Sequence, residues 1–255
     1  FGEALKLLAE RTGVKLERTD TRVQGEKNRL LSVMELASQY YHQALLRSPK
    51  AEVARNYLSA RGIDGAFIDE FHIGYALPDF EHLTPFLLSR KYTANEIVQV
   101  GLALKKDQGY GFFDRFRNRV MIPIRNVHGA VIGFGGRTLD DTAPGPKYIN
   151  SPQTTLYDKG RTVFGLDRAK QAIRRADSVI LVEGYMDFFA IYSSGMQNVV
   201  ATSGTALTVD QIRLVKRFTP HFLFCFDADA AGGQATMRGI ELALKEGIDV
   251  RIVEL

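Results

Sequence analysis

From about residue 166 to its end, the chain alternates short apolar runs with segments of helical periodicity. Strands that alternate with helices in this way form right-handed β–α–β units around a parallel sheet. The region 166–255 therefore predicts a parallel-sheet α/β domain. Its expected strands are 178–183, 198–202, 221–227 and 249–254, and its expected helices are 166–176, 186–194, 208–218 and 232–246.

Carboxylates stand at the ends of two of these strands: Glu183 before a glycine, and the pair Asp227 and Asp229. The carboxyl ends of parallel strands open onto one crevice, and residues two apart on a strand face the same side. Two carboxylates about 4 Å apart repel by roughly 4 kcal/mol at an effective dielectric near 20, so a cation would screen them, and Mg²⁺ is the usual choice near phosphates. The pattern predicts a magnesium-dependent phosphoryl or nucleotidyl transfer site, with Asp229 as a helix N-cap as the alternative.

Asp187 follows Glu183 within the sequence Glu183-Gly184-Tyr185-Met186-Asp187. An acid in the first turn of a helix is already favoured by the helix dipole, which is a purely structural explanation. A supporting role beside the metal is the other explanation, and the sequence leaves both open.

Residues 1–165 are more basic than the rest, with 23 Lys and Arg against 18 Asp and Glu, whereas residues 166–255 have 10 against 11. Helices are expected over 1–62, short helices over 64–104, and a hairpin around residues 126–129. The charge difference is typical of a polyanion-binding surface joined to a metal-binding one, although an ordinary solvated surface explains it equally well.

The composition, with 45% hydrophobic and 24% charged residues, is typical of a soluble globular protein. No apolar run approaches the roughly 18 residues of a membrane span, so we expect no membrane association. The single cysteine, Cys225, excludes an internal disulfide and fits a reducing cytoplasm. We expect a cytoplasmic protein that is a monomer.

Basic residues gather in three places of the first part. At strand spacing, Arg115, Arg117 and Arg119 would share one face, where guanidinium groups suit phosphate contacts; a solvated edge strand is the alternative. The glycine-rich stretch 133–136 predicts a tight strand turn that delivers Arg137, because it lacks the spacing of a nucleotide-binding fingerprint. A loop around Lys147 adds a cation, an aromatic ring and two polar groups.

Six segments of the chain, read in order, closely resemble the RNA-polymerase core of bacterial DnaG-type primases. The last two form the TOPRIM signature, which primases share with topoisomerases, and the resemblance covers almost the whole chain. The segments are Arg117–Ile124, Gly133–Arg137, Pro146–Ser151, Lys159-Gly160, Val182–Asp187 and Asp227–Asp229.

The resemblance implies a mixed α/β basic N-terminal subdomain over 1–165 and a TOPRIM domain, Rossmann-like with a parallel sheet, over 166–255 that is truncated at its C-terminal end. It implies catalysis and metal binding by Glu183, Asp227 and Asp229, with Asp187 as a further metal residue. Nucleotide contacts would come from Lys147, Tyr148, Asn150 and Lys159, and nucleic-acid contacts from Arg115, Arg117, Arg119 and Arg137. Where the family often has other residues around the second aspartate, this chain has Ala228 and Ala230.

The expected activity is synthesis of short RNA primers on single-stranded DNA by metal-dependent nucleotidyl transfer during DNA replication. Mg²⁺ or Mn²⁺ is the expected cofactor, and zinc would belong to an N-terminal module absent from this chain. Expected partners are template DNA, ribonucleoside triphosphates, the RNA–DNA hybrid and, through an absent C-terminal domain, the replicative helicase. The alternatives are a TOPRIM nuclease or topoisomerase, and a catalytically silent nucleic-acid-binding module. As a fragment, the chain is expected to have weak activity or none.

Overall fold

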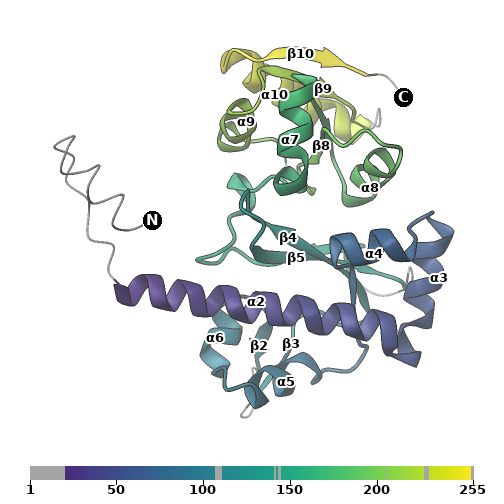
Figure 1. Cartoon of the computed structure of the whole chain (residues 1–255), viewed down its shortest axis with the longest axis vertical. Coiled ribbons are helices and arrows are strands. Elements are labelled where there is room, and N and C mark those ends of the chain that lie inside the picture. The colour runs from purple at the N-terminus through teal and green to yellow at the C-terminus, as the bar shows by residue number, and fades with distance from the viewer. Residues whose placement is uncertain are drawn as a thin grey trace.

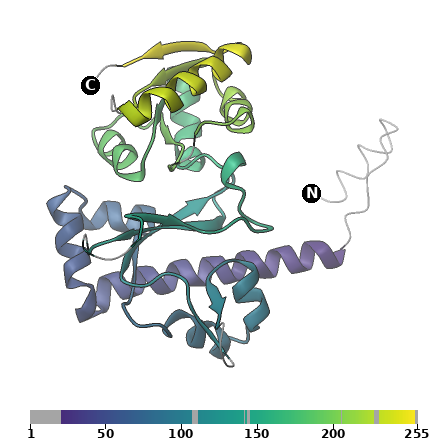
Figure 2. The ribbon, with the colours of Figure 1, turned by 180° about the vertical axis from the view of Figure 1, so that it is seen from behind.

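The computed structural model describes residues 21–106, 111–140, 142, 145–204, 206–226 and 230–253. Two sheets, one from each half of the chain, lie one above the other, and the long helix α2 crosses beneath the lower sheet (Figures 1 and 2). The helices are α2 (Thr21–Arg47), α3 (Glu52–Ala60), α4 (Gly65–Phe71), α5 (Leu83–Ser89), α6 (Ala94–Gln99), α7 (Leu166–Ala176), α8 (Tyr185–Ser193), α9 (Val209–Lys216) and α10 (Ala230–Lys245), with short 3-10 turns η1 (Pro49–Ala51) and η2 (Lys159–Arg161). The strands are β1 (Gly74–Ala76), β2 (Ala103–Lys105), β3 (Phe112–Asp114), β4 (Arg119–Arg125), β5 (Val131–Thr138), β6 (Tyr148–Asn150), β7 (Val179–Val182), β8 (Val199–Ala201), β9 (His221–Phe224) and β10 (Asp249–Ile252).

The second half forms the predicted parallel sheet. Its strand order is β10-β9-β7-β8, and every neighbouring pair is parallel. Local signals place the helices between these strands: Thr208 and Gln211 form a reciprocal capping box at the start of α9. The predicted alternation is confirmed, with strands two or three residues shorter than expected.

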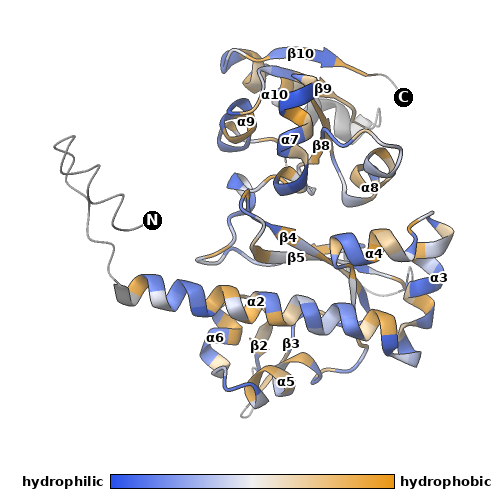
Figure 3. Cartoon of the chain, viewed as in Figure 1, coloured by the Kyte–Doolittle hydropathy of each residue, from blue (hydrophilic) through white to orange (hydrophobic). Residues whose placement is uncertain are grey.

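The first half is built on an antiparallel sheet of order β1-β4-β5-β6. Helix α2 alternates hydrophilic and hydrophobic residues along its length (Figure 3), and its buried side chains include Val33, Met34 and Tyr41. These pack in one apolar cluster with residues of β4, β5, α5 and α6. At Gly74 of β1 a Cβ atom would lie 2.5 Å from the backbone of Tyr41, so only glycine permits this close approach of helix and strand.

The expected tight turn at the glycine-rich stretch is wrong, because residues 133–136 lie within the regular strand β5. The glycines instead leave room for aromatic rings. A Cβ atom on Gly135 would lie 2.6 Å from the ring of Tyr185, and one on Gly136 would lie 2.9 Å from the ring of Phe116. Strand β5 is thereby flat enough for Tyr185, from the other half of the chain, to pack directly on it.

The expected strand face with Arg115, Arg117 and Arg119 is also wrong. Strand β3 ends at Asp114 and β4 begins at Arg119, and Asn118 between them has a left-handed backbone with φ of 49°. A residue in that conformation interrupts the alternation of a strand, so the three arginines point in different directions.

The two halves share one apolar core. Phe164 pairs with Ala201 at the edge of the parallel sheet and packs in the same buried cluster as Tyr185, Phe188 and Ile73. An ion pair between Arg168 and Glu70 adds to the contact. Within the described residues, no helix is long and apolar enough to cross a membrane.

Candidate functional site

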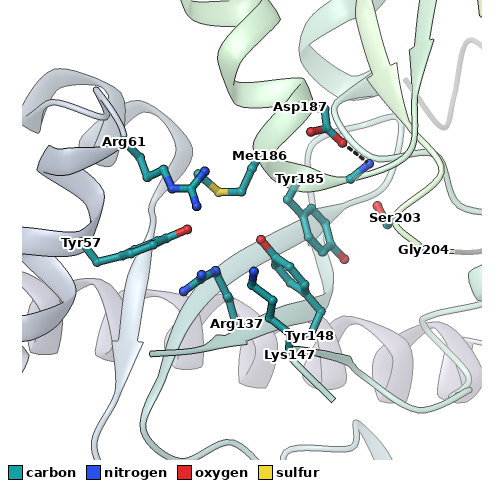
Figure 4. A pocket seen from close by; sticks show the side chains of 11 residues that line it. Tyr57, Arg61, Arg137, Lys147, Tyr148, Tyr185, Met186, Asp187, Ser203 and Gly204 are labelled. Atoms are coloured by element: carbon teal, nitrogen blue, oxygen red, sulfur yellow. Dashed lines mark hydrogen bonds between the residues drawn. The ribbon is translucent and has the colours of Figure 1, made fainter. Parts of the chain in front are cut away.

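A pocket with a cavity volume of about 350 Å³ lies between the two halves (Figure 4). One wall comes from the start of α8, at the carboxyl end of β7, and from the loop after β8; the other comes from α3, β5 and the start of β6. Cationic and aromatic side chains from the first half face one carboxylate from the second. Its lining residues are Tyr57, Arg61, Arg137, Lys147, Tyr148, Gly184, Tyr185, Met186, Asp187, Ser203 and Gly204.

Glu183 follows β7 directly, at the carboxyl end of the parallel sheet. The loop after β8 fixes its backbone: the Gly204 amide donates to the Glu183 carbonyl at 3.2 Å, and the Thr202 amide donates to the Val182 carbonyl at 3.1 Å. Ser203, between them, has a left-handed backbone with φ of 59°. Glu183 is therefore held at the edge of the pocket by a tight loop from the neighbouring strand.

Asp187 lies in the first turn of α8 and lines the pocket. Its carboxylate Oδ2 accepts a hydrogen bond from the Gly184 amide at 2.9 Å, the contact drawn in Figure 4. The structural explanation from sequence is thus observed. A role beside a metal stays a prediction.

The two aspartates expected to complete the metal site, Asp227 and Asp229, lie outside the described residues. Strand β9, which precedes them, is parallel to β7, with Phe224 opposite Leu181. The chain therefore leaves β9 at the same edge of the sheet as Glu183, and carboxylate oxygens are the ligands that Mg²⁺ prefers. Among the described residues alone there is no cluster of three or more acidic, His or Cys side chains. A divalent ion fits this donor set if both aspartates contribute.

Lys147 and Tyr148 both line the pocket, as their expected role requires. The loop that carries Lys147 is held by Arg119, whose guanidinium donates to the carbonyls of Gly136 at 3.0 Å, Lys147 at 3.2 Å and Pro146 at 3.4 Å. Burial, and then the nearby Arg117, lowers the pKa of Arg119. In this structure Arg119 thus binds backbone carbonyl groups. Burial raises the pKa of the Tyr148 hydroxyl.

Asn150 and Lys159 lie next to the pocket and bond to its loop. Asn150 donates to the Ser203 carbonyl at 3.0 Å and accepts from the Tyr185 hydroxyl at 2.8 Å, so its amide joins the two halves. The Lys159 ammonium donates to the Gly204 carbonyl at 3.3 Å, and burial lowers its pKa.

The remaining arginines are dispersed. Arg137 lies in the pocket wall with 5% of its surface exposed. Arg117 lies elsewhere, with its guanidinium over the rings of Phe80 at 4.5 Å and Phe113 at 5.3 Å. Arg115 is partly buried, and burial lowers its pKa.

The pocket residues that sequence reasoning missed include Tyr57 and Arg61, which come from α3 and its C-terminal cap. Neither belongs to a motif with recognisable chemistry. Their only sequence signal is the helix itself, which ends at Arg61 before Gly62, and that signal does not indicate what the helix faces.

Comparison with known proteins shows the family to which the chain belongs. The family of the DNA primase catalytic core, N-terminal domain, matches residues 40–170, more than half of the chain, and the Toprim domain family matches residues 177–254. The chain belongs to the DnaG primase family. A DNA primase of Halalkalibacterium halodurans is 38% identical over 255 residues, which cover 99% of this chain and 42% of that relative.

Solved primase structures have the same fold. The zinc-binding and RNA polymerase domains of the Aquifex aeolicus primase superpose with a TM-score of 0.82 at 36% identity, covering 99% of this chain and 60% of that one. A DnaG primase catalytic domain bound to single-stranded DNA has a TM-score of 0.80 at 36% identity, with 91% and 72% covered. The chain spans less than half the length of the curated primases that it matches, and its fold is that of their catalytic core.

Proposed function

We propose that this chain is the polymerising core of a primase that makes short RNA primers on single-stranded DNA. The observation that carries the proposal is the pocket between the halves, in which Lys147 and Arg137 lie opposite Asp187 of α8, while Glu183 follows β7 next to the pocket residue Gly184. Cations on one wall suit a triphosphate, and the carboxylate of Asp187 on the other wall, with Glu183 beside the pocket, suits a divalent ion. Family membership supplies the reaction class, which is nucleotidyl transfer.

In this proposal Glu183, Asp227 and Asp229 hold Mg²⁺ or Mn²⁺, and Asp187 supports the site. A divalent ion held by these residues would supply the charge that lowers the pKa of an attacking hydroxyl and would neutralise charge on the departing pyrophosphate. Lys147 and Tyr148 contact the incoming nucleotide. Lys159 and Asn150 act from beside the pocket, because their bonds to the loop 202–204 hold that loop against the backbone of Glu183.

Template binding is proposed for the surface around Arg115 and Arg117. The stack of Arg117 with Phe80 and Phe113 supports this, because exposed aromatic rings and guanidinium planes are the groups on which unpaired bases stack. Phe80 is 59% exposed. The solved relative bound to single-stranded DNA makes the same class of ligand reasonable for this chain.

The wider assignments follow from the family. We propose the subdomain division 1–165 and 166–255, a monomeric state, template DNA, the RNA–DNA hybrid and ribonucleoside triphosphates as ligands, and recruitment to the replication fork in the cytoplasm by the replicative helicase through parts of the parent protein outside this chain. Zinc would likewise belong to a part outside this chain.

The test is primer synthesis by the complete parent protein on a single-stranded template, with labelled ribonucleotides. Glu183→Gln is expected to lower the rate by about a hundredfold or more, since it removes a charge at the reacting centre. Glu241→Gln, an exposed carboxylate on α10, serves as the matched control. Unchanged synthesis by Glu183→Gln would contradict the proposal, and metal-dependent DNA cleavage without ribonucleotide incorporation would support a TOPRIM nuclease instead.

A further inference from the structure

Tyr57, on α3, lies between two guanidinium groups in the wall of the pocket. The Cζ atom of Arg137 is 4.0 Å from the centroid of its ring, and that of Arg61 is 5.5 Å away. Figure 4 shows the three side chains together, with the hydroxyl end of Tyr57 directed toward the pocket. One tyrosine thus contacts two like charges that come from different elements of the fold, β5 and the end of α3.

Arg137 has an unusual environment for a charged side chain. It is 95% buried, it donates to the Thr138 carbonyl at 2.9 Å, and it has no ion pair with a carboxylate of the described residues. Its Nε atom is buried without a hydrogen-bond partner in the described part of the chain, and so is the Tyr57 hydroxyl. A buried guanidinium is costly unless a counter-charge or hydrogen-bond acceptor satisfies it. Both atoms belong to residues that line the pocket, so the pocket is the place from which an acceptor would reach them.

The face of an aromatic ring attracts a cation, and the attraction is larger where water is excluded. The ring of Tyr57 therefore partly offsets the burial of Arg137 and restricts the guanidinium to one plane. It also brings Arg61 toward the same side, despite the repulsion between the two arginines. Because Lys147 lines the same pocket, the two arginines and this lysine form a preformed binding site for a polyanion.

We propose that Tyr57 is a positioning residue that holds Arg137, and with it Arg61, in the geometry that binds the polyphosphate chain of a nucleoside triphosphate. The inference rests on the proposed function, in which the pocket holds that nucleotide. The ring of Tyr57 makes the larger contribution to polyphosphate binding, because it orients the guanidinium groups. The hydroxyl makes the smaller one by donating a hydrogen bond to a phosphate oxygen.

The test is isothermal titration calorimetry of this chain with inorganic tripolyphosphate at low ionic strength and without divalent metal, so that the acidic residues are not involved. Tyr57→Phe keeps the ring and is expected to weaken binding about threefold. Tyr57→Leu removes the ring and is expected to weaken it about tenfold or more. In the complete parent, Tyr57→Leu raises KM for the ribonucleotide and leaves kcat nearly unchanged.

A matched control comes from a second tyrosine–arginine contact. Tyr92 has the Arg29 guanidinium 5.1 Å from its ring centroid and does not line the pocket. Tyr92→Leu therefore removes the same kind of contact and is expected to leave tripolyphosphate binding unchanged. Binding of a labelled single-stranded oligonucleotide should be the same for all variants, which a general loss of structure would not permit.

The outcomes separate the two proposals. If the unaltered chain does not bind tripolyphosphate, or if Lys147→Ala binds it as tightly as the unaltered chain, the proposed nucleotide site is wrong. If Lys147→Ala weakens binding but Tyr57→Leu does not, the nucleotide site stands and the role of Tyr57 is overturned. Equal losses in Tyr57→Phe and Tyr57→Leu would also overturn it, because the ring would then contribute nothing beyond the hydroxyl.

Discussion

Replacing Asp114 by alanine is expected to destabilise the first half of the chain strongly. Asp114 is 3% exposed and stands at the end of β3. It accepts four hydrogen bonds at the start of α5, from the amides of His82 at 2.8 Å, Leu83 at 2.7 Å and Thr84 at 2.8 Å, and from the Thr84 hydroxyl at 2.6 Å. Asp114 thus caps a helix that lies thirty residues away in sequence.

The magnitude follows from what alanine leaves behind. A hydrogen bond to a charged group contributes about 1.5–3 kcal/mol, and a buried donor left unsatisfied costs about 1–3 kcal/mol. Loss of an ordinary helix cap costs about 1 kcal/mol, because water replaces it, but this site is buried. Allowing for partial rehydration of the helix start, we expect Asp114→Ala to lower the free energy of unfolding by about 4 kcal/mol.

The assay is urea unfolding followed by circular dichroism, with the slope of the transition used to check that the unfolded state is unchanged. Asp114→Asn keeps the shape but turns one acceptor into a donor, and should cost about 2 kcal/mol; Thr84→Val removes only the hydroxyl bond and should cost about 1 kcal/mol. The double variant Asp114→Ala with Thr84→Val should cost less than the sum, because both act on one network. A loss of 1 kcal/mol or less for Asp114→Ala would refute the reasoning.

Three further perturbations test other contacts. In Gly135→Val the new Cβ atom would lie 2.6 Å from the ring of Tyr185, so the substitution should lower the free energy of unfolding by about 1–3 kcal/mol and weaken tripolyphosphate binding. The control is Gly25→Ala, which has open space around its Cβ and should have neither effect. Tyr185→Phe removes the 2.8 Å hydrogen bond to Asn150 and should lower the free energy of unfolding, measured in urea, by about 1–2 kcal/mol. An unchanged free energy of unfolding would contradict the proposed link between the halves. The Arg29 guanidinium holds the pKa of the Glu96 carboxyl at about 2, below the ordinary 4.5. The ionised Glu96 therefore stabilises the folded state above pH 4.5, and this stabilisation is lost as the pH falls toward 2. The Arg29 side chain is 48% exposed and that of Glu96 is 18% exposed, so solvent partly screens the pair and Glu96→Gln should remove less than about 1 kcal/mol of that acid dependence. The measurement is urea unfolding at pH 6 and pH 3, and an unchanged dependence would contradict the assignment.

Local patterns were sufficient for much of the fold. The parallel-sheet half was predictable because each strand is a short apolar run and each helix has periodicity and a start signal, as at Thr208 and Gln211. In the first half, Thr93 forms a capping box with Glu96 and starts α6, and the hairpin of β4 and β5 turns at residues 126–129. These features depend on neighbours within a few residues.

The errors arose where distant contacts decide the structure. The glycine-rich stretch continues a regular strand and leaves room for the ring of Tyr185, and that contact joins residues fifty positions apart. The arginines after Asp114 do not share a face because Asn118 takes a left-handed backbone between two strands that belong to different sheets. Neither effect leaves a periodic signal in the sequence.

The candidate site was predictable in part for the same reason. Lys147, Tyr148 and Asp187 belong to motifs, and all three line the pocket. Tyr57 and Arg61 reach it only because α3 packs beside β5, so no local pattern indicates them.

The most direct test of the central claim is a crystal of the chain soaked with Mn²⁺ and a ribonucleoside triphosphate, with the metal located by its anomalous scattering. The account predicts manganese beside Glu183 and triphosphate oxygens in contact with Lys147 and Arg137. Nucleotide bound away from these cations, or metal bound at a site that lacks Glu183, would contradict it.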